Sequence, residues 1–497
     1  MNTTLGGMML AMVELRHVRM GSVSTSFSWC RQLEIFEIYI RNSDMQTTFS
    51  LSWQLGIFQI YTRNGDVQVC VSYSTGCDAE ISVEATGFPA VCSPWDKVTE
   101  AYLAAALAID KGNEAALVSW SFKALPDTFG HQRIAEVKYM LEGKESDVTY
   151  SVKCVGRGPG ADECHSLLFE KEYGFYEELA PAMNALLQET GQRSLRIPRC
   201  FTHAQTETFE VMILEDLTTR GFRIVDRRYG MDLAHATIAI QELARLHAAS
   251  YLLQMRTPDK PLAQTYPFIS KEWTKVYKRG GESYEDVLKE HVDLAVAMVE
   301  STYNRANDIN WLKEIRPTVW QRFLEQLEPD EHFAVVCHGD GWSTNILFRY
   351  DSLDVPLEAI FVDLQQVRIA SPATDIQALL MPSVTPTVRL QERNSMLTAY
   401  YSTFNNVLNA GGVKMPFYRQ LMDSEYRKKT LYGFLSAVIY IPLSVQKNGG
   451  RIHPLSEEGG AFIKDKEKMV EALKKDRNVI LYFKGLVDEG ERHGLLE

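Results

Sequence analysis

The 497-residue chain lacks the features that mark several classes of protein. Its eight cysteines form no Cys-x-x-Cys pair and have no regular spacing, which predicts reduced, mostly buried thiols and argues against a zinc site or a disulfide framework. No apolar run is long enough to span about 30 Å of hydrocarbon, and Pro442 interrupts one of the longest. No basic segment precedes the weak apolar run at residues 6–13. We therefore expect a cytoplasmic protein without a membrane partner.

The chain also lacks an excess of positive charge. Lys and Arg total 52 and Asp and Glu total 64, which gives a net charge of -12. A protein that binds the phosphate backbone through bulk charge would be basic, so nucleic acid is not expected as a partner. The hydrophobic fraction of 45% is that of an ordinary globular protein, and the length allows about three domains or a bilobed enzyme with an appendage.

Lysine is absent from the first 96 residues, and residues 1–92 form a segment of distinct composition that contains a duplication. The pattern of residues 32–46 recurs 22 residues later, at residues 54–68. Each copy contains a turn signal and predicts a strand-turn unit. Two copies are fewer than a solenoid needs, so we expect an N-terminal extension and not a repeat protein. A functional module and a duplication without function explain it equally well.

The remaining chain predicts strands first and helices afterwards. This order is typical of an α+β protein with two lobes, a small strand-rich lobe over residues 93–217 and a larger helical lobe over residues 218–497. The expected strands are 133–140, 147–155 and 207–214, and the expected helices are 96–110, 163–180, 232–253, 284–304 and 373–381.

The strongest local pattern is His338-x-Asp340-x-x-x-x-Asn345, which follows an apolar run. This is the spacing of the catalytic loop in kinases, where the Asp accepts the proton of the attacking hydroxyl and the Asn holds magnesium. The apolar runs after it predict a hairpin, and folding the hairpin about Asp354 places Asp363 opposite Asn345. Two carboxylates and a carboxamide are oxygen ligands of the kind that Mg²⁺ takes. A solvated hairpin with incidental polar ends is the alternative.

Two further segments carry residues of interest. Strand alternation places Lys153 on the face opposite its apolar neighbours, and helical periodicity places Glu172 in an apolar stripe. A buried carboxylate needs a cation, so we expect these two side chains to pair, two unrelated surface charges being the alternative. The apolar segment Val211–Leu217, which contains Glu215, leads into the second lobe, and its backbone could bond an adenine edge. His247 is expected to be a structural histidine.

Together these residues resemble the ecdysteroid-kinase-like family of arthropods, within the choline-kinase-like and aminoglycoside-phosphotransferase-like small-molecule kinases. The resemblance runs from about Trp95 to near the C-terminus and implies a bilobal, protein-kinase-like fold. It implies that Asp340 is the catalytic base, that Asn345 and Asp363 hold Mg²⁺, and that Asp375 braces the catalytic loop. Lys153 and Glu172 would position the phosphates of ATP. The motifs that carry it are Phe169-x-x-Glu172-x-x-Phe175-Tyr176, Leu214-Glu215-Asp216-Leu217, Leu243-Ala244-Arg245-Leu246-His247-Ala248, His338-Gly339-Asp340-x-Trp342-x-x-Asn345 and Phe361-Val362-Asp363-Leu364-Gln365.

The resemblance implies an ATP-dependent and Mg²⁺-dependent kinase that phosphorylates a hydroxyl of a small apolar molecule, such as an ecdysteroid or a xenobiotic alcohol. One alternative is an inactive kinase-like scaffold, because the segment Ala124–His131 has one glycine where a nucleotide-covering loop uses small residues. Another is a choline or ethanolamine kinase. A protein kinase is disfavoured because neither Asp-Phe-Gly nor Ala-Pro-Glu follows the catalytic loop.

Overall fold

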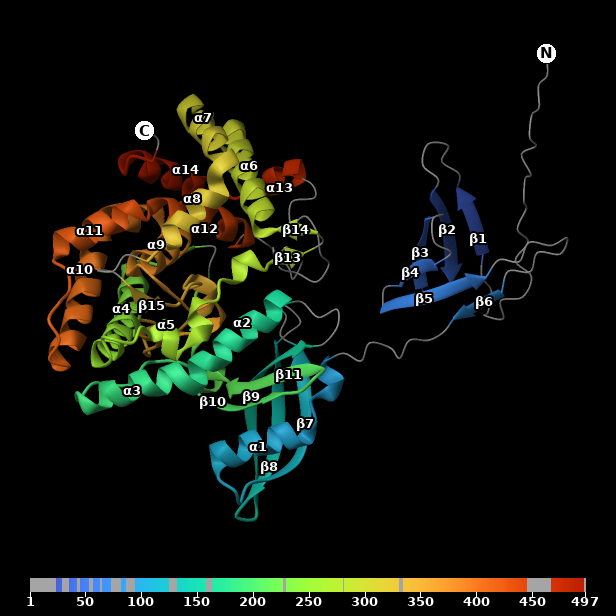
Figure 1. Cartoon of the computed structure of the whole chain (residues 1–497), viewed down its shortest axis with the longest axis horizontal. Helices are drawn as coiled ribbons and strands as arrows, with labels where there is room; N and C mark the ends of the chain where they lie inside the picture. Colours follow the sequence, from blue (N-terminus) through green and yellow to red (C-terminus); the bar gives the residue numbers. More distant parts are fainter. Residues whose placement is uncertain are drawn as a thin grey trace. The chain divides into compact units, whose positions relative to one another are not determined.

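A computed structural model describes residues 94–124, 132–157, 163–226, 229–279, 281–329, 334–444 and 466–495, and the backbone of six strands between residues 24 and 85. The glycine-poor segment expected to cover a nucleotide lies outside the described residues from 125 to 131. The chain divides into two compact units, Met1–Asp96 and Lys97–Glu497, four residues beyond the composition boundary at residue 92. Both units are drawn in Figure 1.

The described part of the first unit is a six-stranded antiparallel sheet whose strands follow one another in sequence order. The two copies of the duplication correspond to two hairpins, β2–β3 and β4–β5, because the 22-residue shift carries Ile35, where β2 begins, onto Ile57, where β4 begins. This agrees with the predicted strand-turn units. The strands are β1 (Ser24–Ser28), β2 (Ile35–Asn42), β3 (Met45–Ser52), β4 (Ile57–Thr62), β5 (Gly65–Ser72) and β6 (Ser82–Ala85).

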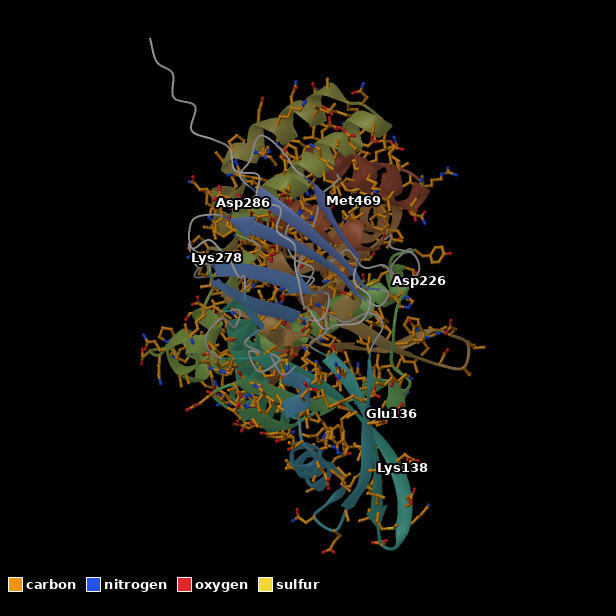
Figure 2. All side chains as sticks on the ribbon, turned by 90° about the vertical axis from the view of Figure 1, so that its right-hand side faces the viewer. Glu136, Lys138, Asp226, Lys278, Asp286 and Met469 are labelled. Carbon is orange, nitrogen blue, oxygen red and sulfur yellow. The ribbon has the colours of Figure 1, made fainter. Side chains whose placement is uncertain are left out.

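The second unit begins with a five-stranded antiparallel sheet of order β10-β11-β9-β8-β7, packed against α1 (Glu100–Lys111). Side chains alternate along β8, where Ala135 and Val137 are buried while Glu136 and Lys138 are exposed. Glu136 and Lys138 are labelled in Figure 2. The expected strand pair is thus confirmed, with longer strands than predicted. The strands are β7 (Ala116–Ala124), β8 (Gln132–Leu141), β9 (Lys144–Gly156), β10 (Cys200–Gln205) and β11 (Phe209–Glu215).

The single helix expected over residues 163–180 is interrupted. It consists of α2 (Glu163–Gly174), a π-helical turn at Phe175–Leu179, and α3 (Ala180–Glu189). The predicted apolar stripe is nevertheless buried, including Glu172 at 1% exposure. These helices run between the sheet and the helices that follow (Figure 1), which places α2 where it can face both lobes.

The second lobe is mainly helical, so the predicted α+β class with two lobes is confirmed. Its core includes a contact of α4 with α10, in which Leu243, Tyr400 and Phe404 are fully buried. In the described part of the chain, no helix combines the length and apolarity needed to cross a membrane. The helices are α4 (Leu233–Arg256), α5 (Leu262–Thr265), α6 (Tyr284–Thr302), α7 (Ala306–Ile315), α8 (Val319–Leu327), α9 (Pro372–Ser383), α10 (Pro386–Ala410), α11 (Arg419–Lys428), α12 (Thr430–Ser444), α13 (Lys466–Leu473) and α14 (Arg477–Arg492).

Short strands in this lobe position the candidate site. β15 pairs with β18, and β16 pairs with both β12 and β17. The expected hairpin is therefore present as β16–β17. The strands are β12 (Arg223–Ile224), β13 (Lys278–Arg279), β14 (Glu282–Ser283), β15 (Val335–Cys337), β16 (Ile346–Tyr350), β17 (Pro356–Phe361) and β18 (Arg368–Ala370).

Candidate active site

The His338–Asn345 segment leaves β15 as a tight loop. Gly339 adopts a left-handed backbone with φ of 82°, and a Cβ atom there would collide with the carbonyl group of Gln366. Only glycine accepts both conditions without strain. His338 bonds the carbonyl oxygen of Val362 through Nε2 at 3.0 Å. The loop is thereby joined at two points to the segment that carries Asp363.

A buried carboxylate holds the start of this loop. Asp375 accepts hydrogen bonds from the backbone N–H groups of His338 at 2.6 Å and Gly339 at 2.9 Å. His247 Nε2 lies 3.0 Å from the same carboxylate, and the other ring nitrogen lies 2.9 Å from the hydroxyl of Tyr400. Burial raises the pKa of Asp375, but these hydrogen bonds outweigh burial and leave that pKa below its ordinary value. The structure thus gives His247 the structural role expected for it.

Asp375 also belongs to a cluster of three potential metal ligands in the described part of the chain. The other two are His247 and Cys337, and the ligand atoms of the three lie within 4.8 Å of one another. Burial raises the pKa of the Cys337 thiol well above its ordinary value, and the sulfur lies 3.4 Å from the carbonyl oxygen of Ser371, to which the thiol can donate. The imidazole and the carboxylate already bond each other, which favours a structural role for all three.

Asp340 sits at the centre of the loop with 7% of its surface exposed. Asn345 Nδ2 donates to its Oδ2 at 2.9 Å and to its backbone carbonyl at 2.9 Å, while the Tyr440 hydroxyl donates to its Oδ1 at 2.5 Å. Burial raises the pKa of Asp340 to about 8 although these hydrogen bonds and Arg368 lower it. The carboxylate is therefore fixed in position and more basic than an exposed one.

The hairpin brings Asp363 back to the loop with a different register from the one predicted. The prediction paired Asn345 with Asp363, but Ile346 pairs with Phe361, and the N–H of Val362 donates to the carbonyl of Asn345 at 3.0 Å. Tyr350 pairs with Pro356, so the turn is centred on Leu353 and not on Asp354, and an irregularity beyond Arg349 shifts the register once more. Symmetric folding about Asp354 is therefore wrong by one residue. Asp363 follows in a left-handed conformation with φ of 64°.

Lys153 meets Asp363 across the two lobes. Its Nζ lies 2.8 and 2.6 Å from the two carboxylate oxygens of Glu172 and 2.7 Å from Oδ1 of Asp363. Burial lowers the pKa of Lys153, but the two carboxylates outweigh burial and raise it above the ordinary value. Burial likewise raises the pKa of Glu172 against the opposing charge of Lys153. The expected pair is therefore present, and it joins β9, α2 and the Asp363 segment.

The oxygen atoms of this group fit a Mg²⁺ ion. Asn345 uses its amide nitrogen to bond Asp340, which leaves its carboxamide oxygen as a candidate ligand, and Asp363 is bonded to Lys153 through one of its two oxygens. Carboxylate and carboxamide oxygens are hard ligands, and Mg²⁺ is bound by one or two carboxylates together with phosphate oxygens. The donor set therefore suits a magnesium ion that arrives with a nucleotide.

Glu215 and Leu217 lie at the end of β11, the strand that pairs Met212 with Lys153. The N–H of Glu215 donates to the carbonyl of Arg199 at 2.8 Å, and its carboxylate accepts from Arg199 and Arg220. The carbonyl of Leu217 accepts from the N–H of Phe222 at 3.2 Å. The N–H of Glu215 and the carbonyl of Leu217 thus bond other protein groups. That the backbone of this segment bonds an adenine edge stays a prediction.

Sequence reasoning missed two residues of the site. Arg368 is buried at 5% exposure and lies 3.4 Å from Glu272, and its charge lowers the pKa of Asp340. A cation inside the apolar run of residues 367–370 was the available signal. Tyr440 reaches Asp340 from a position 100 residues later, within an apolar helix. No local pattern indicates that contact.

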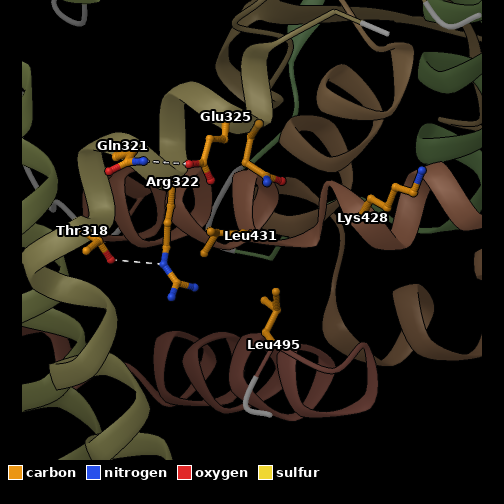
Figure 3. Close-up of a pocket in the computed structure, with 8 residues that line it drawn as sticks. Thr318, Gln321, Arg322, Glu325, Lys428, Leu431 and Leu495 are labelled. Atoms are coloured by element: carbon orange, nitrogen blue, oxygen red, sulfur yellow. Dashed lines mark hydrogen bonds between the residues drawn. The ribbon is translucent and has the colours of Figure 1, made fainter.

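A separate hollow of about 420 Å³ lies beside α8, α11 and α12. Figure 3 shows two hydrogen bonds between lining residues of one segment, Arg322 to Thr318 and Gln321 to Glu325. None of its eight described lining residues belongs to the group around Asp340. Its described lining residues are Thr318, Gln321, Arg322, Glu325, Gln326, Lys428, Leu431 and Leu495.

Comparison with known proteins matches residues 133–412 to the model of the ecdysteroid kinase-like family. No curated protein matches the chain. Similar solved structures include a type VIII aminoglycoside-3'-phosphotransferase, 14% identical, covering 65% of this chain and 94% of its own, with a TM-score of 0.29. Another is an aminoglycoside phosphotransferase from Streptomyces rimosus in complex with ADP and streptomycin, 16% identical, covering 68% and 97%, with a TM-score of 0.29.

Proposed function

Because this chain belongs to the ecdysteroid kinase-like family and is a kinase with a two-lobed α+β fold, we propose that it transfers the γ-phosphate of ATP to a hydroxyl of a small apolar molecule. An ecdysteroid or a xenobiotic alcohol is the acceptor class we propose. The observation that carries the proposal is the convergence of Asp340, Asn345, Asp363 and Lys153 from three separate segments, with direct contacts of Asn345 to Asp340 and of Lys153 to Asp363.

Asp340 acts as the base in this proposal. The acceptor oxygen bonds to the γ-phosphorus, the bond from that phosphorus to the bridging oxygen of ADP breaks, and the hydroxyl proton moves to Asp340. Asn345 holds the Asp340 carboxylate at 2.9 Å, and Asp375 holds the backbone of the same loop. The base is therefore positioned before any substrate arrives, which lowers the entropic part of the barrier.

Lys153 and Glu172 bind and orient the phosphates. Glu172 is buried and keeps the ammonium of Lys153 at the junction of the lobes, within 2.8 Å of both its oxygens. Asp363 and Asn345 would hold a Mg²⁺ ion, which supplies positive charge against the phosphate oxygens. In the nucleotide complex, Lys153 exchanges its bond with Asp363 for bonds to phosphate.

The surroundings of Asp340 support an apolar acceptor. Trp342 stacks on Tyr440 beside the base, with ring centroids 4.4 Å apart. Burial and then neighbouring charges, Asp340 among them, raise the pKa of Tyr284 and Tyr432, so these phenols stay neutral near the base. Aromatic rings offer large apolar faces to a ligand.

A thermal-shift titration tests the nucleotide site. Mg-ATP at about a hundred times its dissociation constant should stabilise the protein by roughly 2.7 kcal/mol. We expect this shift with the unsubstituted chain and with Asp423→Ala, which removes a helix-surface carboxylate paired with Arg419. The shift should be lost without metal or in Asp363→Ala. No shift with the unsubstituted chain at millimolar Mg-ATP would favour the inactive scaffold.

A screen for phosphate transfer tests the reaction. Steroid, choline-like and xenobiotic alcohols are incubated with Mg-ATP, and phosphorylated product is detected by mass spectrometry. Asp340→Asn should bind Mg-ATP and transfer no phosphate, because the amide cannot accept the proton. Normal turnover by this variant would contradict the assignment of Asp340 as base.

A further inference from the structure

The Tyr440 hydroxyl lies where an acceptor hydroxyl would have to lie. It donates to Oδ1 of Asp340 at 2.5 Å, while Asn345 holds Oδ2 at 2.9 Å. Both carboxylate oxygens of the base therefore have a protein partner. A general base must come within about 2.6–3.2 Å of the oxygen whose proton it takes. The Tyr440 hydroxyl takes one of the positions around Oδ1 from which the hydroxyl of an acceptor could donate to this base.

Tyr440 is held by its ring as well as by its hydroxyl. The ring stacks on Trp342 with an angle of 10° between the planes, and Trp342 belongs to the same loop as Asp340. Burial, and then the charge of Asp340, raise the pKa of Tyr440 well above its ordinary value, so the phenol keeps its proton and is the donor. This side chain presents an O–H group to the base as a substrate alcohol would.

The helix that carries Tyr440 is weakened next to it. Pro442 lies inside α12, two residues before the helix ends at Ser444. A proline in a helix lacks the N–H that would bond the carbonyl four residues earlier, here that of Val438. The last turn of α12 is therefore held by fewer backbone bonds, and Tyr440 can turn away from Asp340 at lower cost. Tyr440 lies outside residues 133–412, which the family model matches, whereas its partner Asp340 lies inside them.

We propose that the Tyr440 hydroxyl occupies the position of the acceptor hydroxyl on Asp340, shields this base from water, and is displaced when an acceptor binds. This inference rests on the proposed function. Without the shield, water would bond to Asp340 and attack the γ-phosphorus. Its oxygen bonds to phosphorus, the bridging oxygen of ADP leaves, and the water proton moves to Asp340. The result is ATP hydrolysis without transfer.

The test compares Tyr440→Phe with the unsubstituted chain in two measurements that use Mg-ATP alone. Phe keeps the ring on Trp342 and removes only the hydroxyl. We expect acceptor-free release of phosphate to rise about tenfold, the equivalent of one hydrogen bond to a charged group. The dissociation constant for Mg-ATP, from thermal shift, should be unchanged. Tyr426→Phe is the matched control because it removes a buried hydroxyl whose partner is Glu489, and we expect no rise in hydrolysis.

The outcomes separate the two proposals. If the unsubstituted chain and Tyr440→Phe both bind Mg-ATP and hydrolyse it at the same rate, or if the variant is slower, the shielding role of Tyr440 is wrong and the proposed function stands. An equal rise in Tyr426→Phe would also overturn that role. If the unsubstituted chain does not bind Mg-ATP, the proposed function fails and takes this inference with it.

Discussion

Replacing Asp375 by asparagine should loosen the catalytic loop and destabilise the lobe that carries it. The carboxylate accepts two backbone N–H bonds and lies 3.0 Å from His247 Nε2. Because an ionised carboxylate only accepts, this ring nitrogen must be the donor. An amide has one oxygen and two donor hydrogens, so at least one of the three donors would face an N–H group. A hydrogen bond to a charged group contributes about 1.5–3 kcal/mol, so we expect a loss of about 3 kcal/mol.

The assay is denaturant unfolding of Asp375→Asn beside the unsubstituted chain, with Asp293→Asn as control. Asp293 pairs with Arg316 at the surface, where such pairs contribute under about 1 kcal/mol. The folded-state pKa of Asp375 is below its ordinary value, so its contribution is complete above about pH 4 and is lost only as pH falls through the folded value. The difference in free energy of unfolding between Asp375→Asn and the unsubstituted chain should therefore be constant from pH 6 to 8, because this range lies roughly two units above the pH at which this carboxyl titrates. A loss no larger than that of Asp293→Asn would refute the reasoning.

Three other substitutions give measurable outcomes. Lys171 is fully buried, and burial, then the charge of Arg368, lower its pKa to about 7. The unfolded chain keeps this proton up to about pH 10, so the free energy of unfolding should rise between about pH 7 and 10. Lys171→Met should remove this pH dependence and should raise the free energy of unfolding by on the order of a few kcal/mol below pH 7, measured by denaturant unfolding. Gly339→Ala should cost more than the roughly 1–2 kcal/mol of a left-handed alanine because of its collision with Gln366, whereas Gly412→Ala, with a φ of 71° and open space, should show the backbone cost alone; equal losses in thermal unfolding would contradict the collision. Lys153→Met should weaken Mg-ATP binding at least about tenfold in thermal-shift titration, the equivalent of one charge-assisted hydrogen bond, while Lys138→Met on the exposed face of β8 should leave it unchanged. A normal affinity of Lys153→Met would remove this residue from the phosphate site.

The fold could be predicted where a periodic pattern spans a whole element. The alternation at residues 133–140 and the apolar stripe through Glu172 both match the observed burial. Local irregularities that involve a single residue of a helix or strand could not be predicted, because hydrophobic periodicity is insensitive to a change of one residue. The π-helical turn after Gly174 and the shifted hairpin register before Asp363 are both of this kind.

Site residues followed the same division. The pairing of Lys153 with Glu172 could be predicted because a buried carboxylate requires a cation, and Lys153 was the nearest candidate on a predicted strand. The role of Tyr440 could not be predicted from the sequence, since a tyrosine in an apolar helix has no distinguishing feature until the fold brings it to Asp340. Long-range contacts of this kind depend on tertiary packing, which a single sequence does not encode locally.

The ties between the Asp340 loop and the Asp363 segment limit how the enzyme can open. β15 pairs with β18, His338 bonds Val362, and Gly339 fits closely against Gln366, so Asp340, the proposed base, and Asp363, the proposed metal ligand, should move as one rigid body. The bond from Lys153 to Asp363, 2.7 Å long, crosses the edge of that body. A metal-bound phosphate must part those two groups to enter. Under the proposed function, we therefore expect nucleotide binding to separate Lys153 from Asp363 while the Asp340 loop and the Asp363 segment keep their relative positions.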